Sequence, residues 1–215
     1  MFVLIPTLEL SHIEVFFREF ENYDISPVDK FLIFNNSGKY FDYLHPKVEV
    51  FTFRNNAGVN YCWNRGLAIA KNENKDLMLL NDDVKIKPDF FIKTQEALDN
   101  KSFMSVICPI TTNDLKEFKN YSFDKIVRFR RMKKREGWAF TIRKEVIPNI
   151  RPIPEDLKIF FGDDWLWLMT HGRWLKDYSN IVYHSIGKTM KKHPEIRAIL
   201  NEERRIYTLE LEKLI

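Results

Sequence analysis

The chain has 215 residues, of which 45% are hydrophobic, 14% are aromatic and 30% are charged. This length is typical of one domain, and the apolar content is sufficient for a core, so a multidomain machine and an extensively disordered chain are both excluded. Glycine is scarce, with seven residues, and neither the Walker P-loop pattern nor the dinucleotide-binding pattern GxGxxG occurs. Any phosphate bound by this chain therefore needs a site that is not built from a glycine-rich loop.

The net charge of +4 is distributed unevenly. Residues 116–135 contain nine lysines and arginines against two acidic residues, so this segment carries +7 and the rest of the chain carries −3. A concentrated positive charge attracts an anionic partner to one place, whereas a solvated surface loop is the common alternative for a charge run. Apolar residues alternate with the charges at Val127, Phe129 and Met132, which leaves the two interpretations evenly balanced.

Cysteine usage and hydropathy bear on the location of the protein. The two cysteines, Cys62 and Cys108, indicate neither a disulfide framework nor a Cys-based zinc site, and we interpret both as buried small apolar residues. No basic segment precedes the apolar residues 2–5, and no apolar stretch approaches the roughly 18 residues that a membrane span needs. We expect a soluble, cytoplasmic protein without a transmembrane segment.

In the first half of the chain, apolar runs of strand length alternate with segments of helical periodicity. Such alternation is typical of an α/β fold, in which a mostly parallel sheet is covered by helices on both faces. Ser11 and Glu14 have the spacing of a capping box, which predicts the start of a helix. The other expected elements are strands at residues 2–5 (ended by Pro6), 30–34, 48–53 and 76–80, and a helix at residues 59–70.

The second half is expected to add fewer strands and to end in a helix. We predict a helix from Pro88 to about residue 98 and another at residues 163–171. The last segment, from about residue 194 to residue 215, has apolar residues near helical spacing, with the charged residues 202–205 on its exposed face. Core packing and dimerisation explain this tail equally well. The expected strands are residues 103–108, 138–142 and 181–184.

Polar side chains follow the expected parallel strands. In open α/β sheets, ligands bind beyond the carboxyl ends of the strands. These ends carry Pro6 and Thr7, Asn35, Asn56, and the triplet Asn81-Asp82-Asp83. Asparagine is common in turns, and this preference alone explains any one of these asparagines. Their shared position at strand ends is therefore stronger evidence for a site than the residue type.

Two pairs of adjacent aspartates terminate apolar runs. Asp82 and Asp83 follow a strand without a polar member, and Asp163 and Asp164 open a predicted helix, where the helix dipole favours negative charge. Adjacent carboxylates are unfavourable unless a cation lies nearby, and oxygen ligands suit Mg²⁺ or Mn²⁺. A turn and a helix cap are the alternative explanations. Together, the pairs predict one metal-binding acid and one general base.

The order of these motifs resembles family 2 glycosyltransferases with the GT-A fold. The nucleotide-binding half of that family is similar to Asn56-Ala57-Gly58, Asn64-Arg65-Gly66-Leu67-Ala68, the Asn81 triplet and Pro88-Asp89-Phe90-Phe91, and its acceptor half is similar to residues 137–144 and Gly162-Asp163-Asp164. The resemblance covers residues 2–188. It implies one GT-A domain at residues 1–188, with a nucleotide-sugar-binding half (1–100), an acceptor-binding half (101–188) and a separate helical tail (189–215).

The resemblance implies an inverting transfer of a sugar from a nucleotide-diphosphate sugar, dependent on Mn²⁺ or Mg²⁺. Asn81-Asp82-Asp83 matches the DXD-type motif, so Asp83 would bind the metal, and Asn81 or Asp82 would face the ribose or the sugar of the donor. Asp164, preceded by Asp163, matches the catalytic base, which removes the proton of the acceptor hydroxyl.

The remaining expected site residues are carried by the same resemblance. His184 matches a late histidine that completes the metal shell, with a structural hydrogen bond as the alternative, and Lys188 would reach a phosphate. Pro6, Thr7 and Asn35 match positions around the nucleotide base. The expected donor-binding set also includes Asn56 and Asn64.

Two other functions are compatible with the sequence. A nucleotidyltransferase on a related sheet also uses paired acids and Mg²⁺, although such enzymes usually carry a glycine-rich basic segment after the first strand. A non-catalytic nucleic-acid-binding domain could be built around residues 116–135. The same basic segment could instead recruit a polyanionic acceptor, such as modified DNA, a phosphorylated glycan or a lipopolysaccharide core.

Overall fold

The computed structural model describes residues 1–101, 103–111, 129–132, 136–184, 196 and 198–214. Within these ranges, no helix has both the length and the apolar character needed to cross a membrane. The expected basic segment at residues 116–135 therefore lies largely outside the described residues, as do Lys188 and most of the chain between His184 and Leu200.

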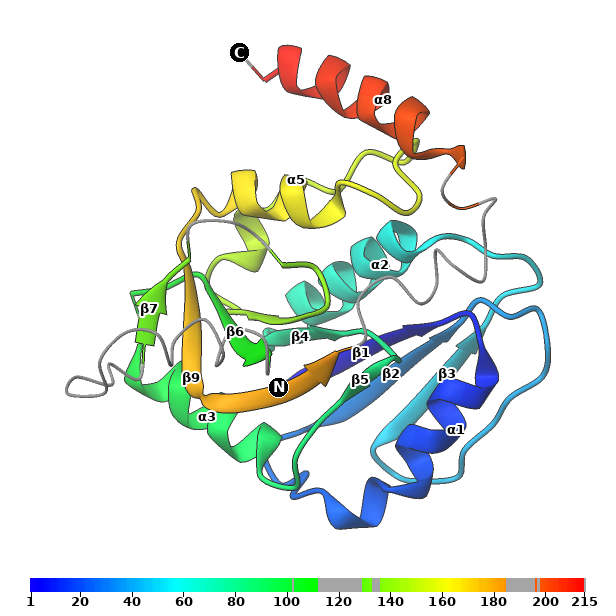
Figure 1. Cartoon of the computed structure of the whole chain (residues 1–215), viewed down its shortest axis with the longest axis vertical. Helices are drawn as coiled ribbons and strands as arrows, with labels where there is room; N and C mark the ends of the chain where they lie inside the picture. Colours follow the sequence, from blue (N-terminus) through cyan, green and yellow to red (C-terminus); the bar gives the residue numbers. More distant parts are fainter. Residues whose placement is uncertain (102, 112–128, 133–135, 185–195, 197, 215) are drawn as a thin grey trace.

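One twisted sheet forms the centre of the molecule (Figure 1). Its strands follow the order β3-β2-β1-β4-β8-β6-β9-β5, and β7 pairs with β9 outside this path. In the described part of the chain, the strands are β1 (Phe2–Thr7), β2 (Lys30–Asn35), β3 (Val48–Thr52), β4 (Leu77–Leu80), β5 (Val84–Lys85), β6 (Val106–Thr111), β7 (Phe129–Arg131), β8 (Ala139–Ile142) and β9 (Trp174–His184).

Most strands of this sheet run in one direction, as expected. β3, β2, β1 and β4 pair in parallel. β8 is antiparallel to both β4 and β6, and β6 is parallel to β9, so β6 and β9 run the same way as β4. The carboxyl ends of β1, β2, β4, β6 and β9 therefore meet at one edge of the sheet, together with the beginning of β8.

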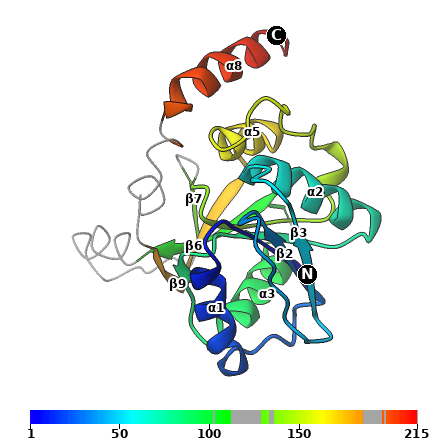
Figure 2. The ribbon, with the colours of Figure 1, turned by 90° about the vertical axis from the view of Figure 1, so that its right-hand side faces the viewer.

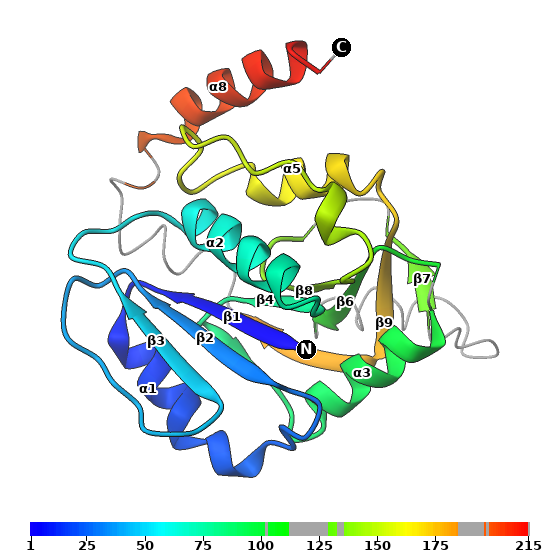
Figure 3. The same cartoon turned by 180° about the vertical axis from the view of Figure 1, so that it is seen from behind.

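Helices cover both faces of the sheet (Figures 1 and 3). Successive residues of β1 point to opposite faces, so Val3 and Ile5 join one buried cluster while Phe2 and Leu4 join another. The helices of the first cluster are α1 (Leu10–Arg18) and α3 (Phe90–Asn100), and those of the second face are α2 (Val59–Asn72), α5 (Gly162–Met169) and α8 (Leu200–Glu212). Short 3-10 turns occupy Phe20–Asn22 and Ile147–Asn149.

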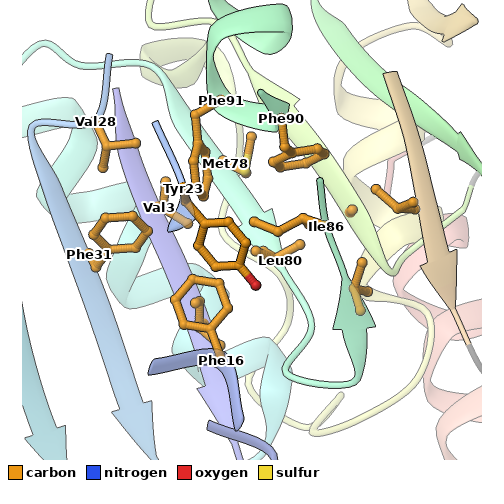
Figure 4. Packing of buried hydrophobic residues seen from close by; sticks show 14 of the residues in the cluster. Val3, Phe16, Tyr23, Val28, Phe31, Met78, Leu80, Ile86, Phe90 and Phe91 are labelled. Atoms are coloured by element: carbon orange, nitrogen blue, oxygen red, sulfur yellow. The ribbon is translucent and has the colours of Figure 1, made fainter. Parts of the chain in front are cut away.

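The first cluster is rich in aromatic rings. Figure 4 shows the rings of Phe16, Tyr23, Phe31, Phe90 and Phe91 gathered in this cluster on one face of the sheet. The rings of Phe31 and Phe91 lie edge to face, with centroids 5.5 Å apart, an arrangement that aromatic pairs favour. This packing fixes α1 and α3 against the sheet and leaves its carboxyl edge open.

Several expected boundaries are corrected by the structure. The predicted capping box is wrong, because α1 begins at Leu10 and its N-cap residue, Glu9, makes no side-chain capping bond. β1 continues through Pro6 to Thr7, since its pairing with β2 extends to the pair Thr7 and Asn35. β9 is longer than the expected residues 181–184, while β5 and β7 are too short to produce a period-2 pattern.

Candidate active site

A pocket of about 370 Å³ lies at the carboxyl edge of the sheet. It gathers residues from the end of β1, the turn after β4 and the start of α5. Its lining also includes the aromatic residues Trp63, Phe160 and Phe161. Of the residues expected at the site, the pocket is lined by Pro6, Thr7, Asn56, Asn81, Asp82, Asp163 and Asp164.

Asp82 is held by groups from the start of the chain. Thr7 Oγ1 donates a 2.7 Å hydrogen bond to Asp82 Oδ2. His12 Nδ1, from the first turn of α1, lies 3.5 Å from Asp82 Oδ1, and His12 Nε2 lies 3.9 Å from Glu9 Oε2. His12 and Glu9 line the pocket but were not expected there. Their position just after the first parallel strand is the signal that could have identified them.

Asp83 lies next to His184 because β5 pairs with β9, and this strand pairing was not predicted from the sequence. β5 is antiparallel to β9, and Val84 lies opposite His184 in the register. This brings Asp83 Oδ1 within 3.3 Å of His184 Nε2, and both side chains are nearly buried, with exposed fractions of 10% and 11%. The ring of Trp138 stacks on His184 at a centroid distance of 5.7 Å.

The Asp83 and His184 pair fits a divalent cation. Among the described residues, Asp83 Oδ1, the atom that faces His184 Nε2, is buried without a hydrogen-bond partner, and such an atom is costly unless something binds it. Two ligands at about 2.1 Å from one ion and at right angles lie about 3 Å apart, which is close to the observed separation. No cluster of three or more His, Cys, Asp or Glu side chains is found in the part of the chain that the structure describes.

Asp163 and Asp164 occupy the first turn of α5. Phe161, the residue before α5, has φ +62°. This left-handed conformation costs a non-glycine residue about 1–3 kcal/mol. A Cβ atom on Gly162 would lie 2.0 Å from Asn60 Oδ1 and 3.0 Å from Trp63 Cζ3, so only glycine fits between α5 and α2. A Cβ on Gly137 would lie 3.0 Å from Asp163 Cγ. Asp163 is therefore packed closely against the backbone of Gly137.

Two other expected donor-binding residues, Asn35 and Asn64, lie outside the lining of this pocket. Asn35 donates to Lys39 O and Thr52 Oγ1 and accepts from Ser37. Asn64 Nδ2 donates to Ile153 O and its Oδ1 accepts from Ile153 N, both at 2.8 Å. Lys188 is outside the described residues.

Asn36, the neighbour of Asn35, lines the pocket instead. Its Nδ2 donates to Cys62 Sγ at 3.2 Å and its Oδ1 accepts from Ala57 N at 3.0 Å. A turn that follows a strand can present either of two adjacent asparagines, and only the tertiary contact with α2 decides which one.

Comparisons with known proteins identify the fold. No protein-family profile matches this sequence, and no curated protein matches it. Residues 1–349 of Staphylococcus aureus TarS are similar in structure, with a TM-score of 0.61 at 12% identity, over 86% of this chain and 60% of that one. GalNAc-T7 with UDP, GalNAc and Mn²⁺ has a TM-score of 0.62 at 12% identity, over 85% of this chain and 42% of that one. The chain has the GT-A fold.

A third GT-A structure is similar over a comparable extent. The mannosyltransferase PcManGT from Pyrobaculum calidifontis, in complex with GDP-Man and Mn²⁺, has a TM-score of 0.61 at 14% identity, over 87% of this chain and 57% of that one. This chain thus spans between about two fifths and three fifths of the length of these three structures. At such identities the likeness defines the GT-A architecture alone.

Proposed function

We propose that this GT-A domain is a metal-dependent, inverting glycosyltransferase that uses a nucleotide-diphosphate sugar and an acceptor hydroxyl. One observation carries the proposal: acids from distant parts of the chain, Asp82 and the Asp163 and Asp164 pair, line one pocket. The next residue after Asp82 is Asp83, which forms the cation-compatible pair with His184. Leaving-group stabilisation and proton removal would therefore be available at the same edge of the sheet.

The donor would be held between the end of β1 and the turn after β4. Asp83 and His184 would hold Mn²⁺ or Mg²⁺, whose positive charge would stabilise the diphosphate. Pro6, Thr7 and Asn56 would line the nucleotide side, and Asn81 or Asp82 would face the ribose or the sugar. Lys188 remains a proposed phosphate ligand, and Asn35 and Asn64 would act through the loops that they hold.

Asp164 is the proposed general base. As the acceptor oxygen forms a bond to the anomeric carbon, the bond from that carbon to the diphosphate oxygen breaks, and the acceptor proton passes to the Asp164 carboxylate. Attack opposite the leaving group inverts the anomeric configuration. Asp163 packs against Gly137 and would orient the start of α5.

The comparisons support a nucleotide sugar and a metal without identifying the sugar. GalNAc-T7 is bound to UDP, GalNAc and Mn²⁺, and PcManGT to GDP-Man and Mn²⁺. The unbridged and buried state of Cys62 and Cys108 supports a reducing compartment, so we propose a cytoplasmic site of action.

A donor panel tests this proposal. The unaltered chain is incubated with UDP- and GDP-sugars, with and without Mn²⁺, and release of nucleoside diphosphate is measured. We expect metal-dependent release, which would distinguish sugar transfer from nucleotidyl transfer. Asp83→Ala should weaken metal-dependent donor binding by about 10- to 100-fold, and Asp164→Asn should lower kcat by about 100-fold or more while donor binding is retained.

Two exposed aspartates provide matched controls. Asp99 and Asp156 are exposed, so Asp99→Ala and Asp156→Asn should leave release and donor binding unchanged. Normal transfer by Asp164→Asn would remove that residue from the base role. Absence of nucleotide release with every donor and metal would overturn the proposed activity.

A further inference from the structure

The loop at residues 157–161 leads directly into the two acids of α5. Ile159, Phe160 and Phe161 line the pocket on the side of α2 and α8. Because Phe161 adopts a left-handed conformation immediately before Gly162, the direction in which α5 starts depends on how this loop is held.

The side chain of Glu203 in α8 binds the backbone of this loop. Glu203 Oε1 accepts from the backbone N–H groups of Lys158 at 3.0 Å and Ile159 at 3.2 Å, and Oε2 accepts from Ile159 at 3.2 Å and Phe160 at 2.7 Å. Three successive N–H groups that converge on one carboxylate form an anion-binding concavity, and bonds to an ionised acceptor are stronger than neutral ones.

The burial of α8 is unusual for an amphipathic helix. Within Leu200–Glu212, all of which the structure describes, Glu203 is the only buried residue, with an exposed fraction of 3%, while Leu209 is 44% exposed. The expectation that residues 202–205 form the exposed face is therefore wrong at Glu203. Figure 2 shows α8 lying against the loop side of α5 and away from the sheet.

Helix α2 also binds the backbone of this loop. Asn60 of α2 donates from Nδ2 to the carbonyls of Leu157 and Phe160, and its backbone N–H donates to Lys158 O. Glu203 accepts from the N–H groups of the loop, whereas Asn60 donates to its carbonyls. The two side chains bind opposite ends of the Leu157–Lys158 peptide unit, and Glu203 and the Asn60 backbone N–H bind opposite ends of the Lys158–Ile159 unit. The stacking of Phe161 on Tyr207, with centroids 5.1 Å apart, adds a further contact to α8.

We propose that Glu203 is a positioning residue for glycosyl transfer, which fixes the loop that presents Asp163 and Asp164 to the pocket. The inference rests on the proposed function, since it assigns a role to the base. The C-terminal segment also supplies pocket lining through Ile196 and Leu200, so it forms part of the site and is more than a surface tail.

The test combines hydrogen exchange with kinetics of the full chain. Glu203→Gln keeps the size of the side chain but replaces one acceptor by an NH₂ group, and Glu203→Ala removes both acceptors. Glu202→Gln is the matched control, because the Glu202 side chain is 68% exposed. Exchange of the amides at residues 158–160 should accelerate at least tenfold in Glu203→Ala, less in Glu203→Gln, and not in the control.

The kinetic result should follow the same order. With the donor found in the panel, kcat should fall by about 100-fold in Glu203→Ala and by a smaller factor in Glu203→Gln, while the KM for the donor changes less than threefold. A thermal melting temperature close to that of the unaltered chain separates this effect from unfolding, and Glu203→Gln preserves the comparison if Glu203→Ala fails to fold.

Three results would overturn the inference. They are a normal kcat in Glu203→Gln with accelerated exchange, unchanged exchange in both variants, and a loss of kcat that is matched by the fraction of unfolded protein. Absence of turnover in the unaltered chain would instead reject the proposed function and remove the catalytic role of Glu203, while exchange would still report the contact.

Discussion

Burial raises the pKa of the Cys62 thiol from 9.0 to about 11, although the hydrogen bond from Asn36 acts in the opposite direction. The neutral thiol therefore persists to higher pH than in an unfolded chain. At pH 9 a free thiol of ordinary pKa is half ionised, whereas Cys62 would be only about 1% ionised.

This shift predicts slow alkylation of Cys62 in the native protein. Treatment with iodoacetamide at pH 9 should leave Cys62 unmodified over a period in which both cysteines react fully in guanidinium chloride, because the thiolate is scarce and inaccessible. Peptide mass spectrometry after digestion measures the modification. Native labelling at the rate of a free thiol would contradict the burial of this side chain.

Single residues differ in how far the sequence predicts their place. Asp82 and Asp164 could be assigned to one site because each ends an apolar run and the motif order is recognisable. Glu203 could not, because its sequence neighbours form a charge run that is typical of an exposed face. Its burial depends on N–H groups that are more than 40 residues away in the chain, and no local pattern encodes that contact.

At the level of elements, β9 contains the irregularity that directs its end toward the site. Its pairing with β6 passes from Asp177 opposite Pro109 to Ile181 opposite Ile110, so three residues of β9 are extra. Asp177 Oδ1 accepts from Ser179 N and Oγ, which satisfies the bulged backbone. Beyond this bulge β9 pairs with β5 and carries His184.

Asn180 connects the bulge to α3. Its Nδ2 donates to Phe90 O and Thr94 Oγ1, both at 3.0 Å, in a buried environment. Asn180→Ala should lower the free energy of unfolding by about 1–3 kcal/mol, because it removes two buried hydrogen bonds. Urea unfolding measures the change. Asn100→Ala is the control, since the hydrogen bond from the Asn100 side-chain amide is exposed. An equal loss of unfolding free energy in both variants would argue against a special role for the bulge.

Long, buried strands could be predicted from the sequence, whereas very short strands could not. The parallel strands β1, β2 and β4 are continuous apolar runs, and their existence could be predicted. β5 has two residues and β7 has three, so their side chains show no usable periodicity. The pairing of β5 with β9 brings Asp83 to His184, and for this reason the sequence could suggest the two as metal ligands only through family resemblance.

At the scale of the whole molecule, the two described arginines of the basic segment, Arg130 and Arg131, lie outside the lining of the acidic pocket. Arg130 and Arg131 of β7 are exposed, and Arg131 lines a second pocket with Trp167 and His171. Arg128 and most of the basic segment lie outside the described residues. We propose that this segment recruits a polyanionic acceptor, and that any dimer forms through the exposed Leu209 side of α8.

Neutralisation of the basic segment tests acceptor recruitment. Replacing Arg128, Arg130 and Arg131 by Gln should raise the KM for a polyanionic acceptor about tenfold at low ionic strength, and the difference should shrink with added salt. Donor affinity, measured by titration calorimetry, should not change.

A triple variant of equal charge serves as the control. Arg18, Arg65 and Lys71 are exposed on the helices α1 and α2, so their replacement by Gln should leave the acceptor KM unchanged. An equal effect of both triple variants would show that net charge alone governs acceptor binding.

The position of β8 has a consequence for assembly. β8 lies between β4 and β6 but follows both in the chain. A fragment that ends at residue 100 would therefore leave β4 as an unpaired edge, and its sequence, Leu77–Leu80, is entirely apolar. Such an edge is a template for pairing with another chain. Residues 1–100 thus depend on β8 to cover the edge of β4, and separate expression of the first 100 residues should yield an aggregating product.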